Sequence, residues 1–121
     1  MQQIVTLASQ LNFADVVISG IALALLMEAI TLGLRFGYGL TANRHTAILG
    51  RVTRDIRVHH GYVGLLAGFF AWGTSCWLQA LANGLAILAM GLVLSDVVHH
   101  FLVLWPLTGS HEFHLRYRRE G

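Results

Sequence analysis

Three long apolar runs constrain the fold of this 121-residue chain more than any other feature. They cover about residues 13–36, 58–81 and 85–105, and each reaches the roughly 20 residues that a helix needs to cross a bilayer. Helices and closed barrels alone satisfy every backbone hydrogen bond in lipid. Charged residues make up 12% of the chain, about half the share in soluble proteins. The sequence therefore predicts an all-α integral membrane protein, with residues 1–121 forming a single bundle of three transmembrane helices.

Between the first two runs, the connector has a helical periodicity of its own. Over about residues 46–57 the apolar side chains fall on one side of a helix and most charged side chains on the other. The apolar set is Ile48, Leu49, Val52 and Ile56, and the charged set is Arg51, Arg54, Asp55 and Arg57. This pattern predicts an interfacial amphipathic helix on the cytoplasmic surface.

Two local signals predict how the second and third runs pack. Gly64 and Gly68 have the GxxxG spacing of close contact between membrane helices. Asn83 and Gly84 favour a tight turn, because both residues tolerate positive φ. We therefore expect these two runs to form an antiparallel hairpin.

The distribution of basic residues predicts the orientation. All eight are arginine, five of them between residues 35 and 57 and three in the tail. Because positively charged loops stay in the cytoplasm, we expect the amino terminus outside and the carboxyl terminus inside, in the inner (plasma) membrane. The net charge of +2 is too small to indicate binding to nucleic acid, so the expected surroundings are the lipid bilayer.

Ionisable residues interrupt the apolar runs at three places. Asp96, His99 and His100 are spaced i, i+3 and i+4, which puts them on one helix face. Glu28 lies in the first run, and a His-His pair opens the second. By helical rise, Glu28 is about 12 Å and His99 about 9 Å inside the cytoplasmic end. Charged and polar groups at such depth are costly and mark functional sites.

All of these groups fall in the cytoplasmic half, so we expect them to meet in one pocket. Imidazole ligands suit zinc, copper and iron, and added carboxylate favours zinc or non-haem iron. The predicted cofactor is therefore a divalent metal. The candidate metal ligands are Glu28, His59, His60, Asp96, His99 and His100. Glu28 is also the candidate catalytic residue, because its depth makes an idle charge expensive.

These residues predict a membrane metalloprotein that oxidises or hydrolyses a hydrophobic or lipid substrate. Histidine-rich membrane hydroxylases and desaturases are similar in placing His-His pairs near the cytoplasmic ends of their spans. The segment from Asp96 to His99 also resembles half of a carboxylate-bridged di-iron motif, whose second half a homodimer would supply. Three helices form a thin shell, so we expect a homo-oligomer or partner membrane subunits.

Other functions stay open from the sequence. The membrane anchors of succinate dehydrogenase resemble this chain in size and in having three spans, and this likeness of architecture implies an accessory subunit that ligates haem b or another pigment through histidine. Intramembrane acids and histidines also serve as conduits for protons or metal ions. Whether the protein is an enzyme is not determined by these patterns.

Overall fold

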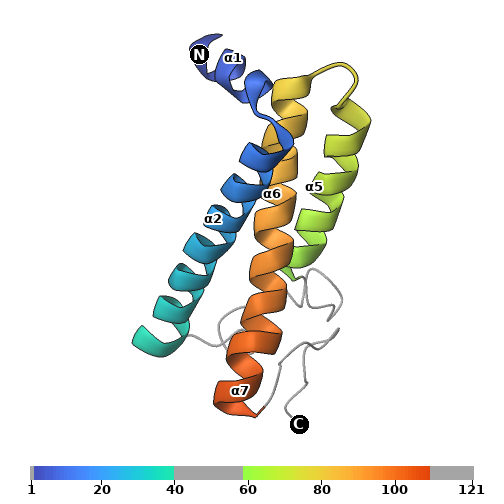
Figure 1. Ribbon diagram of the computed structural model, residues 1–121. Coiled ribbons are helices and arrows are strands. Elements are labelled where there is room, and N and C mark those ends of the chain that lie inside the picture. The colour runs from blue at the N-terminus through green and yellow to red at the C-terminus, as the bar shows by residue number, and fades with distance from the viewer. Residues whose placement is uncertain (1, 40–58, 110–121) are drawn as a thin grey trace.

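In the computed structural model, the described residues are 2–39 and 59–109, and all regular structure within them is helical (Figure 1). The elements are α1 (Gln2–Gln10), α2 (Phe13–Leu32), η1 (Gly33–Gly37), α5 (His60–Thr74), α6 (Gln79–Val97), η2 (Val98–Leu104) and α7 (Trp105–Thr108), where η marks π-helix. The helices α2 and η1 are continuous, as are α6, η2 and α7. The all-α prediction is confirmed for these residues, and the predicted amphipathic helix at about 46–57 lies outside them.

Two helices are long and apolar enough to cross a membrane. They are Phe13–Gly37, with 25 residues, and Gln79–Thr108, with 30. At 1.5 Å per residue they measure about 37 and 45 Å, more than the roughly 30 Å of a bilayer core. The helix α5 has 15 residues and measures about 22 Å, so it is shorter than the predicted span at 58–81.

The turn between α5 and α6 lies earlier in the chain than Asn83 and Gly84. The chain leaves α5 at Thr74, whose carbonyl accepts backbone hydrogen bonds from Trp77 and Leu78. Asn83 lies inside α6 instead, where its side-chain amide donates to the carbonyl oxygens of Ala8 and Leu11. The predicted turn is therefore wrong, because Asn83 is used to fasten α1 to α6.

The helix α6 lies between α2 and α5 and contacts both (Figure 1). Small residues make these contacts close, as membrane-type helix packing requires. The buried residues of α2 are Val16, Gly20, Ala24 and Glu28, and those of α5 are Gly61, Gly64, Ala67 and Ala71. Both predicted glycines face α6, Gly64 in the closer contact, and the buried stripe also includes Ala67.

Two adjacent rows of residues on α6 face the two neighbouring helices, one row towards α2 and the other towards α5. A Cβ on Gly91 would lie 2.6 Å from a Leu23 side-chain atom of α2, whereas the next residue, Leu92, lies against Gly64 of α5. Because successive helical residues are about 100° apart, positions 91, 95 and 99 form one stripe and positions 92, 96 and 100 the other. This register decides which helix each polar residue of α6 meets.

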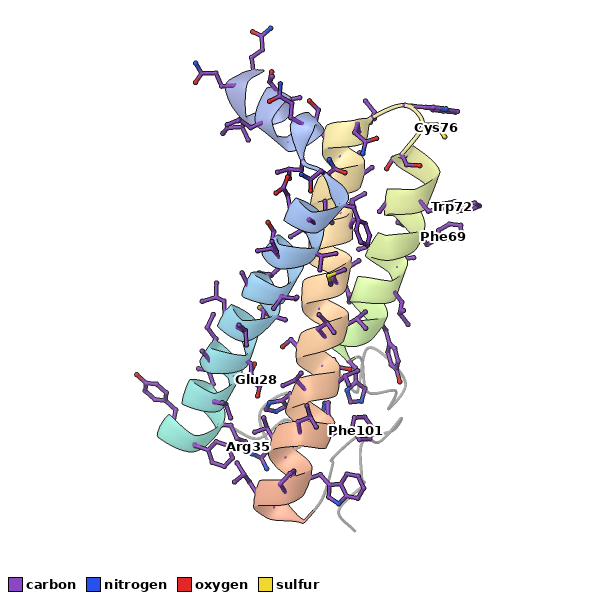
Figure 2. All side chains as sticks on the ribbon, viewed as in Figure 1. Glu28, Arg35, Phe69, Trp72, Cys76 and Phe101 are labelled. Carbon is purple, nitrogen blue, oxygen red and sulfur yellow. The ribbon has the colours of Figure 1, made fainter. Side chains whose placement is uncertain are left out.

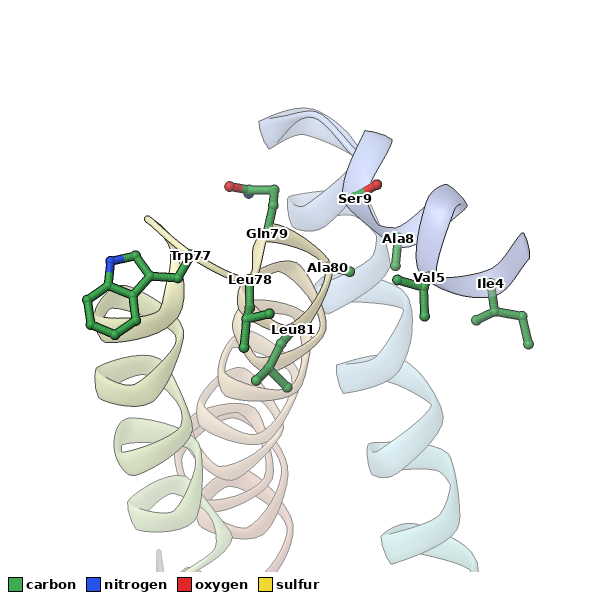
Figure 3. A pocket seen from close by; sticks show the side chains of 9 residues that line it. All are labelled: Ile4, Val5, Ala8, Ser9, Trp77, Leu78, Gln79, Ala80 and Leu81. Atoms are coloured by element: carbon green, nitrogen blue, oxygen red, sulfur yellow. The ribbon is translucent and has the colours of Figure 1, made fainter. Parts of the chain in front are cut away.

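An apolar groove of about 530 Å³ lies at the end of the bundle that carries α1 and the α5–α6 turn (Figure 3). Its lining includes Ile4, Val5, Ala8, Trp77, Leu78 and Leu81. The start of α5 and the helix η2 lie at the opposite end (Figure 1). The groove is therefore remote from the polar residues singled out by the sequence.

Close packing at Gly64 predicts a specific loss of stability. A Cβ at this position would lie 2.9 Å from the backbone oxygen of Ala89, which has no room to move. We expect Gly64→Ala to lower the free energy of unfolding by about 1–3 kcal/mol through overpacking. Thermal unfolding of the purified protein, followed by circular dichroism, measures the change.

The control substitution is Gly73→Ala in the same helix, because a Cβ there meets nothing within 4 Å. Alanine favours helix over glycine, so the stability of this variant should be unchanged or slightly higher. Equal stability of the Gly64 and Gly73 variants would contradict the close contact between α5 and α6.

Candidate metal centre

The six predicted ligands gather at one end of the bundle, where α5 begins and α6 passes into η2. Glu28 comes from α2 and points towards α6 (Figure 2). His59 and His60 come from the start of α5, and Asp96, His99 and His100 from the α6–η2 junction. Five of the six are buried, whereas the His60 side chain is 31% exposed. The predicted convergence of side chains from all three helices is thus observed.

Three of these residues form a group that could hold a metal ion. His59, Asp96 and His100 are all buried, and each offers a ligand atom that lies within 4.8 Å of the others. His59 Nδ1 and His100 Nε2 each lie 3.7 Å from Asp96 Oδ1. Ligand atoms at about 2.0–2.1 Å from a tetrahedral metal are about 3.3–3.4 Å apart. The two nitrogen–oxygen separations exceed hydrogen-bond lengths and need a contraction of about 0.3–0.4 Å to reach this value.

The Asp96 carboxylate supports a cation at this point. Its Oδ1 atom is buried and accepts no hydrogen bond, although His60 Nδ1 also lies only 3.3 Å away. A buried carboxylate oxygen without a partner is costly. Three imidazole nitrogens therefore lie 3.3–3.7 Å from a carboxylate oxygen that accepts no hydrogen bond, an arrangement that a metal ion between them would stabilise.

Glu28 and His99 form a separate pair between α2 and α6. Glu28 Oε1 and His99 Nδ1 are 3.0 Å apart and share a hydrogen bond, while Glu28 Oε2 is buried without a partner. Both residues lie outside the group of three, as does His60. The structure therefore brings all six candidates together but divides them into a His59–Asp96–His100 group and a Glu28–His99 pair.

The division follows from the two stripes of α6. Positions 96 and 100 face α5, so Asp96 and His100 meet His59 there. Position 99 is turned towards α2, where it meets Glu28. The ring centres of His99 and His100 are nevertheless only 5.4 Å apart, which makes the group and the pair direct neighbours.

The local backbone at the two histidines is π-helical. The helix η2 runs from Val98 to Leu104, and the Trp105 N–H donates to the carbonyl of His100, five residues earlier. Such wider turns occur frequently at functional sites. The π-helical segment therefore begins directly before His99 and His100.

Gly61 contributes to the site although it is not among the six predicted ligands. A Cβ at this position would lie 2.7 Å from Asp96 Oδ2 and 3.1 Å from Asp96 Cβ. The absence of a side chain lets the carboxylate fill this space, with Oδ1 within 3.7 Å of His59 and His100. A glycine directly after the His-His pair was the signal available in the sequence.

The contact at Gly61 predicts that this glycine positions Asp96. We expect Gly61→Ala to displace the carboxylate and to weaken binding of Co²⁺ or Zn²⁺ by about ten- to a hundredfold, as does loss of residues that orient metal ligands. Titration of the purified protein by isothermal calorimetry measures the affinity.

A matched control for Gly61 lies two turns further along α5. The Cβ of Gly68→Ala would be 3.5 Å from the Ala89 Cβ, an ordinary contact, so metal affinity should be unaltered. If both alanine variants bound metal as tightly as the unsubstituted protein, Gly61 would have no role in placing Asp96.

Comparisons of this chain with protein-family models, with curated proteins and with solved structures find no match.

Proposed function

We propose that this protein is a membrane metalloprotein whose metal is held by His59, Asp96 and His100. The observation that carries the proposal is that these three ligand atoms lie within 4.8 Å of one another and are all buried. Asp96 Oδ1 adds support, because it accepts no hydrogen bond while three imidazole nitrogens lie 3.3–3.7 Å from it. Two histidines and one carboxylate form a donor set used by both zinc and non-haem iron(II) enzymes.

A three-ligand set of this kind supports catalysis better than a purely structural role. Structural zinc sites close the coordination sphere with four protein ligands, whereas catalytic sites keep a position for water or substrate. Zinc bound in this way supplies an activated water for hydrolysis, and iron(II) supplies oxygen chemistry. We propose an apolar or lipid substrate, because the site lies among helices whose outward faces are apolar.

The ring geometry favours a bare metal ion over haem b at this group. His59 and His100 pack edge to face, with ring centres 4.9 Å apart. Two axial imidazoles on one haem must instead lie on opposite sides of the porphyrin, with the macrocycle between them. These two rings in contact leave no such slot, so haem ligation is the less favoured alternative.

We propose that α5 also lies in the membrane, as a short third span beside the two long helices. Its outward face carries large apolar side chains that are at least half exposed, including Leu65, Phe69, Phe70 and Trp72. Water would leave this face unfavourably hydrated, whereas lipid covers it. With the arginine-rich connector and tail in the cytoplasm, the metal centre falls in the cytoplasmic half of the inner membrane.

Metal analysis of the detergent-purified protein tests the proposed ligands. We expect His59→Ala, Asp96→Asn and His100→Ala to lose bound zinc or iron at this position, because each removes one of three ligands. Inductively coupled plasma mass spectrometry, expressed per chain, measures the loss, and circular dichroism checks that each variant remains helical.

Asp15→Asn is the matched control, since it makes the same chemical change at the far end of α2, where Asp15 belongs to a capping box. This variant should keep its metal. Absence of any bound or bindable metal in the unsubstituted protein would rule the proposal out, and so would full occupancy in both Asp96→Asn and His100→Ala.

The single cysteine tests the membrane orientation. Cys76 is exposed in the α5–α6 turn, at the end of the bundle opposite to the candidate metal centre (Figure 2). With the proposed topology this turn is outside, so a membrane-impermeant maleimide should label Cys76 in intact cells or spheroplasts. The control Cys76→Ser should remain unlabelled, and labelling only after permeabilisation would reverse the orientation.

A further inference from the structure

We infer that Glu28 and His99 hold a second metal ion beside the first, so that the centre is dinuclear. This inference rests on the proposed function, because the second position is defined relative to the ion held by His59, Asp96 and His100. It assigns a ligand role to a pair that lies outside that group of three.

Glu28 is the main support. Glu28 is 7% exposed. It continues the buried stripe of α2 that Val16, Gly20 and Ala24 form. Within the described part of the chain, one carboxylate oxygen contacts His99 and the other, Oε2, is buried without a hydrogen bond. A pair that served only to fasten α2 to α6 would leave this oxygen unsatisfied, at a substantial desolvation cost.

The distance within the pair also suits metal ligands. Glu28 Oε1 and His99 Nδ1 are 3.0 Å apart, and adjacent ligands about 2.1 Å from an octahedral metal are also about 3.0 Å apart. The same separation accommodates the hydrogen bond when no ion is bound. A cation could therefore enter between the two atoms without movement of α2 or α6, with Oε2 as an additional ligand.

The pair is close enough to the first position to belong to one centre. The rings of His99 and His100 are 5.4 Å apart and come from adjacent residues of one helix. Enzymes with two metals place the ions about 3.5–4 Å apart and use both to activate one substrate. Two divalent ions carry more charge than Asp96 and Glu28 neutralise, so an anion such as hydroxide must complete the centre.

Metal stoichiometry tests the second position. Purified full-length protein is stripped with a chelator, reloaded with Zn²⁺ and desalted, and bound zinc is counted per chain. We expect two ions in the unsubstituted protein and in the Asp15→Asn control. Glu28→Gln and His99→Ala should each bind one, because the first set of ligands is intact in both.

The possible outcomes separate the two proposals. One ion in the unsubstituted protein, retained in Glu28→Gln and lost in Asp96→Asn, would overturn the dinuclear centre and leave the proposed metal site standing. No ion in the unsubstituted protein would overturn both. Two ions that both remain in Glu28→Gln and His99→Ala would place the second ion elsewhere and overturn this assignment.

A spectroscopic measurement on the unsubstituted protein does not depend on the folding of any variant. When the protein is loaded with Mn²⁺ at increasing ratios, two neighbouring ions interact magnetically and broaden or split the electron paramagnetic resonance spectrum. We expect this coupled signal as loading approaches two ions per chain. A spectrum of isolated Mn²⁺ at every loading would contradict the inference.

Discussion

The close approach of α5 to α6 is the constraint on which the site depends. At Gly61 and Gly64 there is no room for a Cβ, because atoms of α6 would lie within 3 Å of it. The same approach carries His59, at the start of α5, to within 3.7 Å of Asp96. Larger side chains at Gly61 and Gly64 would hold the two helices apart and separate the Asp96 carboxylate from the His59 imidazole. The small-residue stripe and the polar cluster are therefore parts of one packing arrangement.

The central position of α6 lets one helix organise two polar contacts. Leu92, Asp96 and His100 face α5, whereas Gly91 and His99 face α2. In this register the two side chains of the His-His dipeptide, which project about 100° apart, turn towards different neighbours. The two imidazoles of His99 and His100 are thus committed to different helices while their rings remain in contact. Both histidines lie within the π-helical segment η2.

Much of this arrangement could be predicted from the sequence, because apolar length and helical spacing are local properties. The first predicted span, at 13–36, corresponds to the helix Phe13–Gly37, and the six polar candidates do gather at one end. The position of the turn between α5 and α6 was not predictable from such local properties. Asn83 carries a strong local preference for a turn, but its amide finds two backbone carbonyls near α1, and such distant partners are not encoded in neighbouring residues. The division into a group and a pair likewise depends on the register between helices.

The contacts around Asp96 differ in length from those of a network of hydrogen bonds. In a network, an imidazole N–H would lie about 2.7–3.2 Å from the carboxylate oxygen and point at it. The three nitrogens around Asp96 Oδ1 lie at 3.3–3.7 Å, and that oxygen accepts no hydrogen bond. A buried carboxylate oxygen that accepts no hydrogen bond is costly, so structural fastening alone explains this arrangement poorly. A cation drawn from solution would satisfy the carboxylate oxygen, and the buried His59–Asp96–His100 group could hold one, which is why we propose that these residues bind a metal.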